Sequence, residues 1–363
     1  MVGRMPDPPL SLLVKPASAL CNLRCGYCFY RETAAGRANG VMTEATAGLL
    51  IEKIFARDPP SVAVVFQGGE PTLAGLGFYE SFVAEVGRRN LRRVPVQYCI
   101  QTNGVLIDDE WADFLQRNRF LVGLSLDGDR EINDRFRVDN AGESSFDAVL
   151  RAADTLRRHA AEFNILAVVT DESAGEAERI YGFFKKQGFG YLQFIPVVDE
   201  GCGASLSAEN YAVFLKSMFD LWYRDLVNGE YISIRTFDNY INILRGFPPE
   251  NCGMRGVCGG YFVVESDGAL YPCDFYCGEE YRLGSITDKD PFALRENHRD
   301  FIEKSKIIYG RCRECEYGFL CRGGCRRDRS AELTENRYCA AYKAFFRYAE
   351  KRMQAVADGI ENG

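Results

Sequence analysis

Histidine is nearly missing from this sequence, which has only His159 and His298 in 363 residues. Zinc sites of mixed cysteine and histidine ligands are therefore almost excluded, and so is much histidine-based acid–base catalysis. The chain also lacks an apolar run of about 18 residues, which a membrane-spanning helix needs. Its first residues, MVGRMPDPPL, lack the apolar core of a secretory signal peptide. We therefore expect a cytoplasmic protein with no membrane partner.

An excess of basic charge is also absent. The 44 lysine and arginine residues are outnumbered by 51 acidic ones, which leaves a net charge of −7. Such a chain is a poor candidate for general nucleic-acid binding, so no nucleic-acid partner is expected. Hydrophobic residues make up 47% of the sequence, which is enough for a sizeable core.

Cysteine, by contrast, is abundant. The chain has 14 cysteines, and nine of them lie from Cys252 onward. In a long chain without an export signal, this number indicates metal or redox chemistry rather than disulfides.

Short apolar runs alternate with amphipathic stretches over the first two thirds of the chain. Such alternation predicts βαβ units and a parallel sheet, either a partial barrel or a doubly wound sheet. In both architectures, functional loops follow the carboxyl ends of the strands. The predicted strands are 11–16, 62–67, 94–101, 120–128, 163–170 and 191–198, and the clearest helices are 43–56 and 147–163.

The character of the sequence changes after about residue 230. Cysteine, glycine and arginine become frequent, and SDG separates two β-rich runs in FVVESDGALYPCDFY, which predicts a hairpin. We therefore predict a first domain over 1–235 and a cysteine-rich domain over 236–363, closed by a helix at 339–358.

Three cysteines follow the first predicted strand in CNLRCGYCFY, with the spacing C-x3-C-x2-C: Cys21, Cys25 and Cys28. Three thiolates can hold three irons of a 4Fe–4S cluster and leave the fourth iron open to a small molecule. The alternative is three buried or loosely zinc-bound cysteines.

This motif resembles that of the radical S-adenosylmethionine (SAM) superfamily, in which the open iron binds SAM and one electron cleaves it to a carbon radical. The resemblance implies a partial (β/α)6 barrel. It also implies that GGEP, with Gly68, Gly69 and Glu70, contacts the SAM amino group. Ser125 and Arg137 become candidates for binding the SAM carboxylate; the alternatives are an ordinary strand-end serine and a surface arginine.

The later cysteines resemble the SPASM extension of radical SAM enzymes that modify peptides. The resemblance implies two auxiliary 4Fe–4S clusters, and hence three clusters in all. The first would be held by Cys252, Cys258, Cys273 and Cys325, and the second by Cys312, Cys315, Cys321 and Cys339. Spacing alone leaves two four-cysteine zinc sites as the alternative. Cys99, Cys202 and Cys277 receive no role.

Longer segments, including LLVKPASALCNLRCGYCFY, FQGGEPTLAG and CRGGCRR, resemble anaerobic sulfatase-maturating enzymes over nearly the whole chain. Those oxidoreductases convert a cysteine or serine of a sulfatase to Cα-formylglycine without oxygen. The resemblance implies an unfolded or nascent sulfatase as partner, and a low-potential electron donor such as ferredoxin or flavodoxin.

By the same resemblance, Asp274 is the catalytic base, because it follows Cys273 in YPCDFY and aligns with the family's aspartate. An aspartate in a turn is the structural alternative. Tyr30, Gln67 and Gln101 flank the same loops and are candidate substrate contacts, although each could equally be structural.

Two other functions fit parts of this pattern. The first is a SPASM enzyme that forms a thioether or epimerises a residue in a ribosomally made peptide. Such enzymes usually carry a further peptide-recognition domain, for which we expect no room before the first strand. The second is an iron–sulfur electron carrier, which would need neither the open three-cysteine site nor GGEP.

Overall fold

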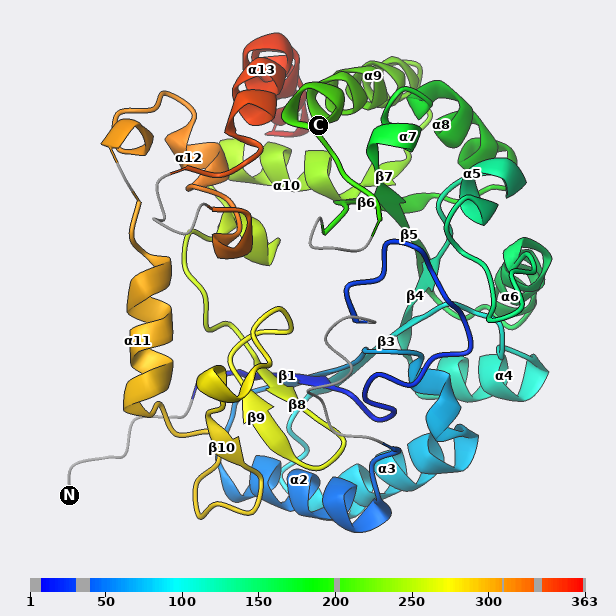
Figure 1. Cartoon of the computed structure of the whole chain (residues 1–363), viewed down its shortest axis with the longest axis vertical. Coiled ribbons are helices and arrows are strands. Elements are labelled where there is room, and N and C mark those ends of the chain that lie inside the picture. The colour runs from blue at the N-terminus through cyan, green and yellow to red at the C-terminus, as the bar shows by residue number, and fades with distance from the viewer. Residues whose placement is uncertain (1–7, 31–39, 199–202, 309, 330–334, 362–363) are drawn as a thin grey trace. The chain divides into compact units, whose positions relative to one another are not determined.

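The computed structural model describes residues 8–30, 40–198, 203–308, 310–329 and 335–361 (Figure 1). Over the first two thirds of the chain, strands alternate with helices, which confirms the predicted α/β class. The six predicted strands are present as β1 (Leu10–Val14), β2 (Val62–Phe66), β3 (Val96–Thr102), β4 (Leu121–Ser125), β5 (Phe163–Val169) and β6 (Tyr191–Pro196). The helices among them are α2 (Glu44–Ala56), α3 (Leu76–Arg89), α4 (Asp109–Arg117), α5 (Arg130–Asp134), α6 (Phe146–Arg158), α7 (Asp171–Ala174) and α8 (Ala177–Lys186).

From residue 208 onward the strands are shorter, and two helices of 20 and 23 residues are present. Its elements are α9 (Ala208–Val227), β7 (Ser233–Ile234), α10 (Arg235–Leu244), β8 (Phe262–Val264), β9 (Ala269–Tyr271), β10 (Gly284–Ser285), α11 (Glu296–Ser305), α12 (Gly318–Cys321) and α13 (Cys339–Glu361). The predicted closing helix is therefore present as α13. Among the helices described, none has the length and apolar character needed to cross a membrane.

Two compact units make up the chain, and each combines separate stretches of sequence. Unit 1 consists of Met1–Ser125, Arg137–Phe163 and Gly259–Asp300, and unit 2 consists of Leu126–Phe136, Asn164–Cys258 and Phe301–Gly363. The domain boundary predicted at residue 235 follows the change in sequence character and remains a prediction.

The sheet of unit 1 joins the predicted hairpin to the early strands. Its order is β10–β9–β8–β1–β2–β3–β4. Strands β8 and β9 pair antiparallel, as the SDG turn predicts, whereas β8 pairs parallel with β1, with Val14 opposite Val264. Because parallel strands end at the same edge, the residues that follow β1 and β8 lie side by side.

Helices α2 and α3 lie next to one another beside this sheet (Figure 1). Helix α2 begins where the Thr43 hydroxyl accepts a hydrogen bond of 3.1 Å from the backbone N–H of Thr46. Its Leu50, Ile51 and Ile54 are buried at helical spacing, so one apolar face packs inward. These helices thereby cover the strands whose ends carry the candidate site.

In unit 2, β5, β6 and β7 form a parallel set, and the long helices α9 and α13 pack against each other (Figure 1). Their contact is aromatic, with the ring centroids of Phe219 and Phe345 5.6 Å apart at nearly perpendicular planes. This edge-to-face packing anchors α13, which begins at the predicted cluster ligand Cys339.

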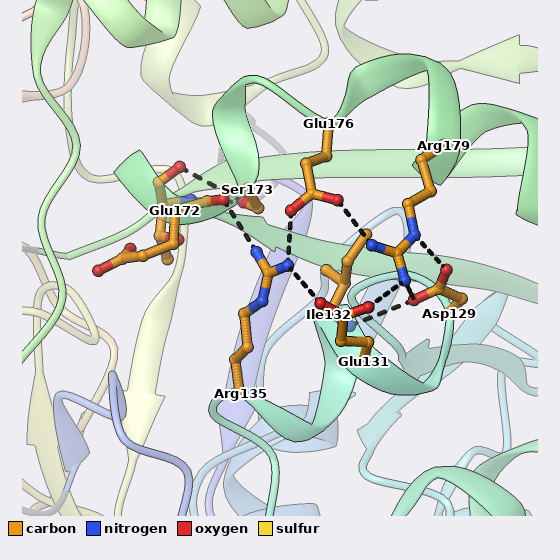
Figure 2. Close-up of polar contacts among 9 residues, drawn as sticks. Asp129, Glu131, Ile132, Arg135, Glu172, Ser173, Glu176 and Arg179 are labelled. Carbon is orange, nitrogen blue, oxygen red and sulfur yellow. Dashed lines mark hydrogen bonds and ion pairs between the residues drawn. The ribbon is translucent and has the colours of Figure 1, made fainter.

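A network of ion pairs secures α5 within unit 2 (Figure 2). The guanidinium of Arg179 on α8 contacts Asp129 at 2.5 Å and Glu131 at 2.7 Å. Arg135 pairs with Glu176 at 2.6 Å. Each arginine is shared between carboxylates, so the network fixes the short segment that follows β4.

Candidate functional site

The three-cysteine loop follows β1 in unit 1. Its backbone turns at Cys28, whose N–H donates to the carbonyl of Cys25 at 3.2 Å. Two donors face the sulfur of Cys21: the N–H of Leu23 at 3.4 Å and the side-chain amide of Asn103 at 3.8 Å. Donors aimed at a cysteine sulfur suit a thiolate that ligates iron, because they disperse its negative charge. The loop therefore fits the predicted open-cluster site.

The glycine loop after β2 packs against this cysteine loop. Gly68 and Gly69 have φ values of +108° and +51°. A Cβ atom on Gly69 would lie 2.2 Å from the carbonyl oxygen of Leu20, immediately before Cys21. That same carbonyl accepts a hydrogen bond of 2.7 Å from the N–H of Glu70. Only glycine permits this approach, so the loop presents bare backbone beside the predicted cluster.

Glu70 is almost fully buried, and both oxygens of its carboxylate accept hydrogen bonds from other groups of the protein. Oxygen Oε1 accepts hydrogen bonds from the N–H and hydroxyl of Thr72 and from the hydroxyl of Thr102, while Oε2 accepts one from the N–H of Asn103. These four bonds tie the GGEP loop to the end of β3. Contact between the GGEP segment and SAM remains a prediction, and the geometry gives the Glu70 side chain a positioning role within it.

Ser125 and Arg137 both belong to unit 1 and are both 7% exposed. Ser125 ends β4. The guanidinium carbon of Arg137 lies 5.4 Å from the ring centre of Tyr27, inside the three-cysteine motif. The adjoining Val138 accepts a hydrogen bond of 2.7 Å from the N–H of Arg24. The structure thus places Arg137 beside the cysteine loop, where its predicted contact with SAM stays a prediction.

Asp274 follows Cys273 directly and is 4% exposed. One carboxylate oxygen, Oδ2, accepts a short hydrogen bond from the hydroxyl of Tyr30, and the other, Oδ1, pairs with the ammonium of Lys15. Two predicted site residues, far apart in sequence, are therefore in direct contact. The carboxylate is buried and held at both oxygens, so its orientation is fixed, and its role as the catalytic base remains a prediction.

Gln67 and Gln101 occupy the ends of neighbouring strands, and both are partly buried. The backbone N–H of Gln67 extends the β1–β2 pairing by donating to the carbonyl of Val14 at 3.0 Å. Gln101 lies within β3. Their predicted contacts with a peptide remain predictions.

Four of the later cysteines surround one cavity in unit 2, of about 40 Å³. They are Cys312, Cys315, Cys321 and Cys339, the set predicted for the second auxiliary cluster. Burial raises the pKa of the Cys321 thiol and raises that of Cys339 to about 12. Without a bound cation both thiols would stay protonated, so a metal cluster would be needed to hold them as thiolates.

The first auxiliary set divides between the units. Cys252, Cys258 and Cys325 belong to unit 2, where a Cβ on Gly253 would lie 3.8 Å from the Cβ of Cys325. Cys273 belongs to unit 1, so its grouping with the other three stays a prediction. Across the described ranges, no three His, Cys, Asp or Glu side chains are placed to hold a single metal ion. Cys202 lies outside the described residues.

Sequence reasoning missed Lys15 and Glu265. Lys15 is fully buried, and its ammonium lies 3.3 Å from Oε1 of Glu265 as well as against Asp274. A signal was present: each is a charged residue that directly follows an apolar strand, in LLVKP and FVVESDG. Nothing in the sequence, however, shows that these two strands pair.

Comparison with known proteins shows the family of this chain. A family model described as the radical SAM superfamily matches residues 16–184. A cysteine-type anaerobic sulfatase-maturating enzyme of Clostridium perfringens is 43% identical over 98% of this chain and 100% of its own length. One from Clostridium novyi is 40% identical over 96% and 97%. A serine-type enzyme of Bacteroides thetaiotaomicron is 31% identical over 98% and 92%.

Solved structures give the same family. Native anSMEcpe with bound AdoMet and the Cp18Cys peptide superimposes with a TM-score of 0.92 at 42% identity, over 97% of this chain and 100% of that one. Streptococcus suis SuiB bound to S-adenosylmethionine has a TM-score of 0.61 at 17% identity, which shows a shared fold alone. The predicted radical SAM fold is thereby confirmed, and the chain belongs to the anaerobic sulfatase-maturating enzymes of the radical SAM superfamily.

Proposed function

We propose that this enzyme oxidises a cysteine of a sulfatase polypeptide to Cα-formylglycine. The preference for cysteine rests on identity, which is 40–43% to the three cysteine-type relatives and 31% to the Bacteroides serine-type enzyme. The observation that carries the proposal is the buried Asp274 carboxylate, adjacent to Cys273 and within the same compact unit as the three-cysteine loop.

Family membership implies a 4Fe–4S cluster and SAM. The loop of Cys21, Cys25 and Cys28 would hold that cluster, with the bare backbone of Gly68 and Gly69 facing SAM. We further propose the two auxiliary clusters on the sets named above, which makes three. When bound, SAM and the clusters would supply the chemistry that removes a hydrogen atom from the substrate Cβ and accepts one further electron.

The protein's own part is to take up the proton. Oxidation of a –CH₂–SH side chain to a thioaldehyde removes two electrons and two protons. One electron and one proton leave together as the hydrogen atom from Cβ, and the second proton leaves from sulfur. Asp274 accepts this second proton, and water then converts the thioaldehyde to the aldehyde with release of H₂S. A positioned base of this kind typically contributes about 10²–10⁴-fold.

Tyr30, Gln67 and Gln101 would orient the substrate peptide. Tyr30 holds Asp274 through its hydroxyl, and its ring stacks with that of Phe29, the centroids lying 4.2 Å apart. The polypeptide partner is supported by the relatives' names and by the peptide complex of anSMEcpe. A ferredoxin or flavodoxin as electron donor, an unfolded or nascent substrate, and the cytoplasmic location remain predictions.

The test is direct. Protein reconstituted with iron and sulfide is incubated anaerobically with SAM, a reductant, and a sulfatase-derived peptide whose target residue is cysteine, serine or alanine. Mass spectrometry should detect formylglycine from the cysteine peptide, a smaller yield from serine, and none from alanine. Cleavage of SAM without formylglycine from either peptide would contradict the proposal. A thioether or an epimerised residue would favour the alternative of ribosomal-peptide modification.

A further inference from the structure

Lys15 lies at the centre of a buried charge network, and the reaction described above gives this lysine no role. Its backbone N–H donates to the carbonyl of Val264 at 2.9 Å, which extends the parallel pairing of β1 with β8. This register places Lys15 next to Glu265, the residue that follows β8. The side chain of Lys15 is 0% exposed, so its ammonium is removed entirely from water.

The ammonium contacts two carboxylates and two other groups. It pairs with Oδ1 of Asp274 and, at 3.3 Å, with Oε1 of Glu265. It also lies 3.8 Å from the sulfur of Cys277 and 4.8 Å from the ring centre of Tyr30. A buried ammonium is costly unless it is paired, and here one lysine serves two buried acids, so the three groups together carry one negative charge.

Asp274 is thereby fixed at both of its oxygens. Tyr30 donates to Oδ2, and Lys15 pairs with Oδ1. A carboxylate held at one oxygen could still rotate, whereas two opposed contacts set the plane of the group. Holding a reacting group in one geometry is a recognised source of rate, because small misplacements are costly.

The network around Lys15 also reaches the cysteine and glycine loops. The second oxygen of Glu265 accepts a hydrogen bond of 3.1 Å from the hydroxyl of Ser18, three residues before Cys21. The aliphatic stem of Lys15 lies so close to Gly68 that a Cβ there would be 2.9 Å from Cγ. Lys15 and Glu265 together therefore connect the proton acceptor to the loops predicted to hold the cluster and SAM.

We propose that Lys15 is the positioning residue of the proton acceptor, orienting and charge-balancing the Asp274 carboxylate relative to those loops. This inference rests on the proposed function, in which Asp274 takes the thiol proton. A purely structural lysine would affect folding and leave the use of SAM unchanged. A positioning lysine would instead determine how often SAM cleavage ends in product.

The test compares Lys15→Met, Lys15→Arg and Lys53→Met at matched iron content. Lys53 is a lysine of α2 whose ammonium donates to the carbonyl of Asp288 at 2.7 Å, away from this network. The ratio of formylglycine to 5′-deoxyadenosine should fall about tenfold or more in Lys15→Met. This fall is smaller than the fall expected when the base itself is removed. The ratio should recover in part in Lys15→Arg and stay normal in Lys53→Met. Peptide affinity, measured without reductant, should change little.

A double-mutant cycle separates positioning through Asp274 from any independent effect. In an Asp274→Asn background, Lys15→Met should lower the ratio no further, because the group it positions is already disabled. An equal fall in both backgrounds, or a normal ratio in Lys15→Met alone, would overturn the inference.

If Lys15→Met fails to fold because two acids are left unpaired, Lys15→Met with Glu265→Gln keeps the network's charge at minus one. The inference predicts that this pair also uncouples SAM cleavage from product. A normal ratio in the pair would mean that Lys15 only neutralises Glu265, and the inference would fail. Absence of formylglycine in the wild type would instead refute the proposed function itself, so the two failures are distinguishable.

Discussion

The hydroxyl of Thr102 donates a hydrogen bond of 2.7 Å to Oε1 of Glu70 and so joins the end of β3 to the GGEP loop. Glu70 accepts three further bonds from Thr72 and Asn103. We predict that Glu70→Ala lowers the free energy of unfolding by about 2–3 kcal/mol, because buried donors lose their acceptor. Urea unfolding of the reconstituted protein measures this loss. Glu80→Gln, at an exposed position on α3, is the control and should be nearly neutral. Equal stability of the two variants would contradict the positioning role of Glu70.

Gly69→Ala should displace the loop that carries Cys21. The new Cβ would meet the carbonyl oxygen of Leu20 at 2.2 Å, where φ is +51°. We expect weaker SAM binding by at least tenfold and partial loss of iron, both measurable without turnover. The matched change Gly87→Ala lies in α3, where a Cβ meets no atom within 4 Å. There a gain of about 0.5–1 kcal/mol in stability is expected instead. Normal SAM affinity in Gly69→Ala would refute this account of the loop.

Replacing Cys21, Cys25 and Cys28 together by alanine should remove one cluster of three. Iron should fall from about twelve to about eight atoms per chain, as the four-iron count of such sites predicts. SAM cleavage should stop, because no open iron site remains. Cys99→Ala, a change at a half-buried cysteine of β3, should keep both iron and cleavage. Cleavage retained in the triple variant would show that the open site lies elsewhere.

His298 should make the protein sensitive to mild acid. Its ring is 1% exposed, its nitrogens have no hydrogen-bond partner within the described part of the chain, and burial lowers its pKa below the ordinary value of 6.5. The unfolded chain therefore binds a proton more readily than the folded one as the pH falls below 6.5. The stability that results from neutral His298 is fully present above pH 6.5. It is lost progressively as the pH falls from 6.5 to the lowered pKa of the folded protein.

His298→Phe should therefore reduce the fall in the urea midpoint between about pH 7.5 and about pH 5.5. His159→Gln is the control, since His159 is partly exposed and lies 2.8 Å from Asp109. An unchanged pH dependence in His298→Phe would show that other groups govern acid stability.

The fold was largely predictable from local pattern. Each predicted strand and the SDG hairpin are present. A short apolar run with flanking turn residues indicates a buried strand without any information from the rest of the chain. The convergence of the three-cysteine loop with GGEP was predictable too, since carboxyl ends of parallel strands share an edge.

The contacts around Asp274 were not predictable in the same way. Lys15 meets Glu265 only because β1 pairs with β8 in one register, and such long-range pairing leaves no local trace in the sequence. Glu70 was expected at the cofactor, yet its carboxylate is satisfied by Thr72, Thr102 and Asn103. The sequence identified Glu70 as a site residue. It could not show which neighbouring groups would donate hydrogen bonds to its carboxylate.

Asp274→Asn at matched iron content tests whether Asp274 accepts the thiol proton. The amide keeps the shape of the carboxylate and removes its basicity, so all three clusters should remain and SAM should still be cleaved. The measurement is the ratio of formylglycine to 5′-deoxyadenosine with the cysteine peptide. We predict a fall of about 10²-fold or more in that ratio, because the thiol proton has no acceptor. An unchanged ratio with normal product yield would contradict this prediction, and would mean that Asp274 is only a turn residue.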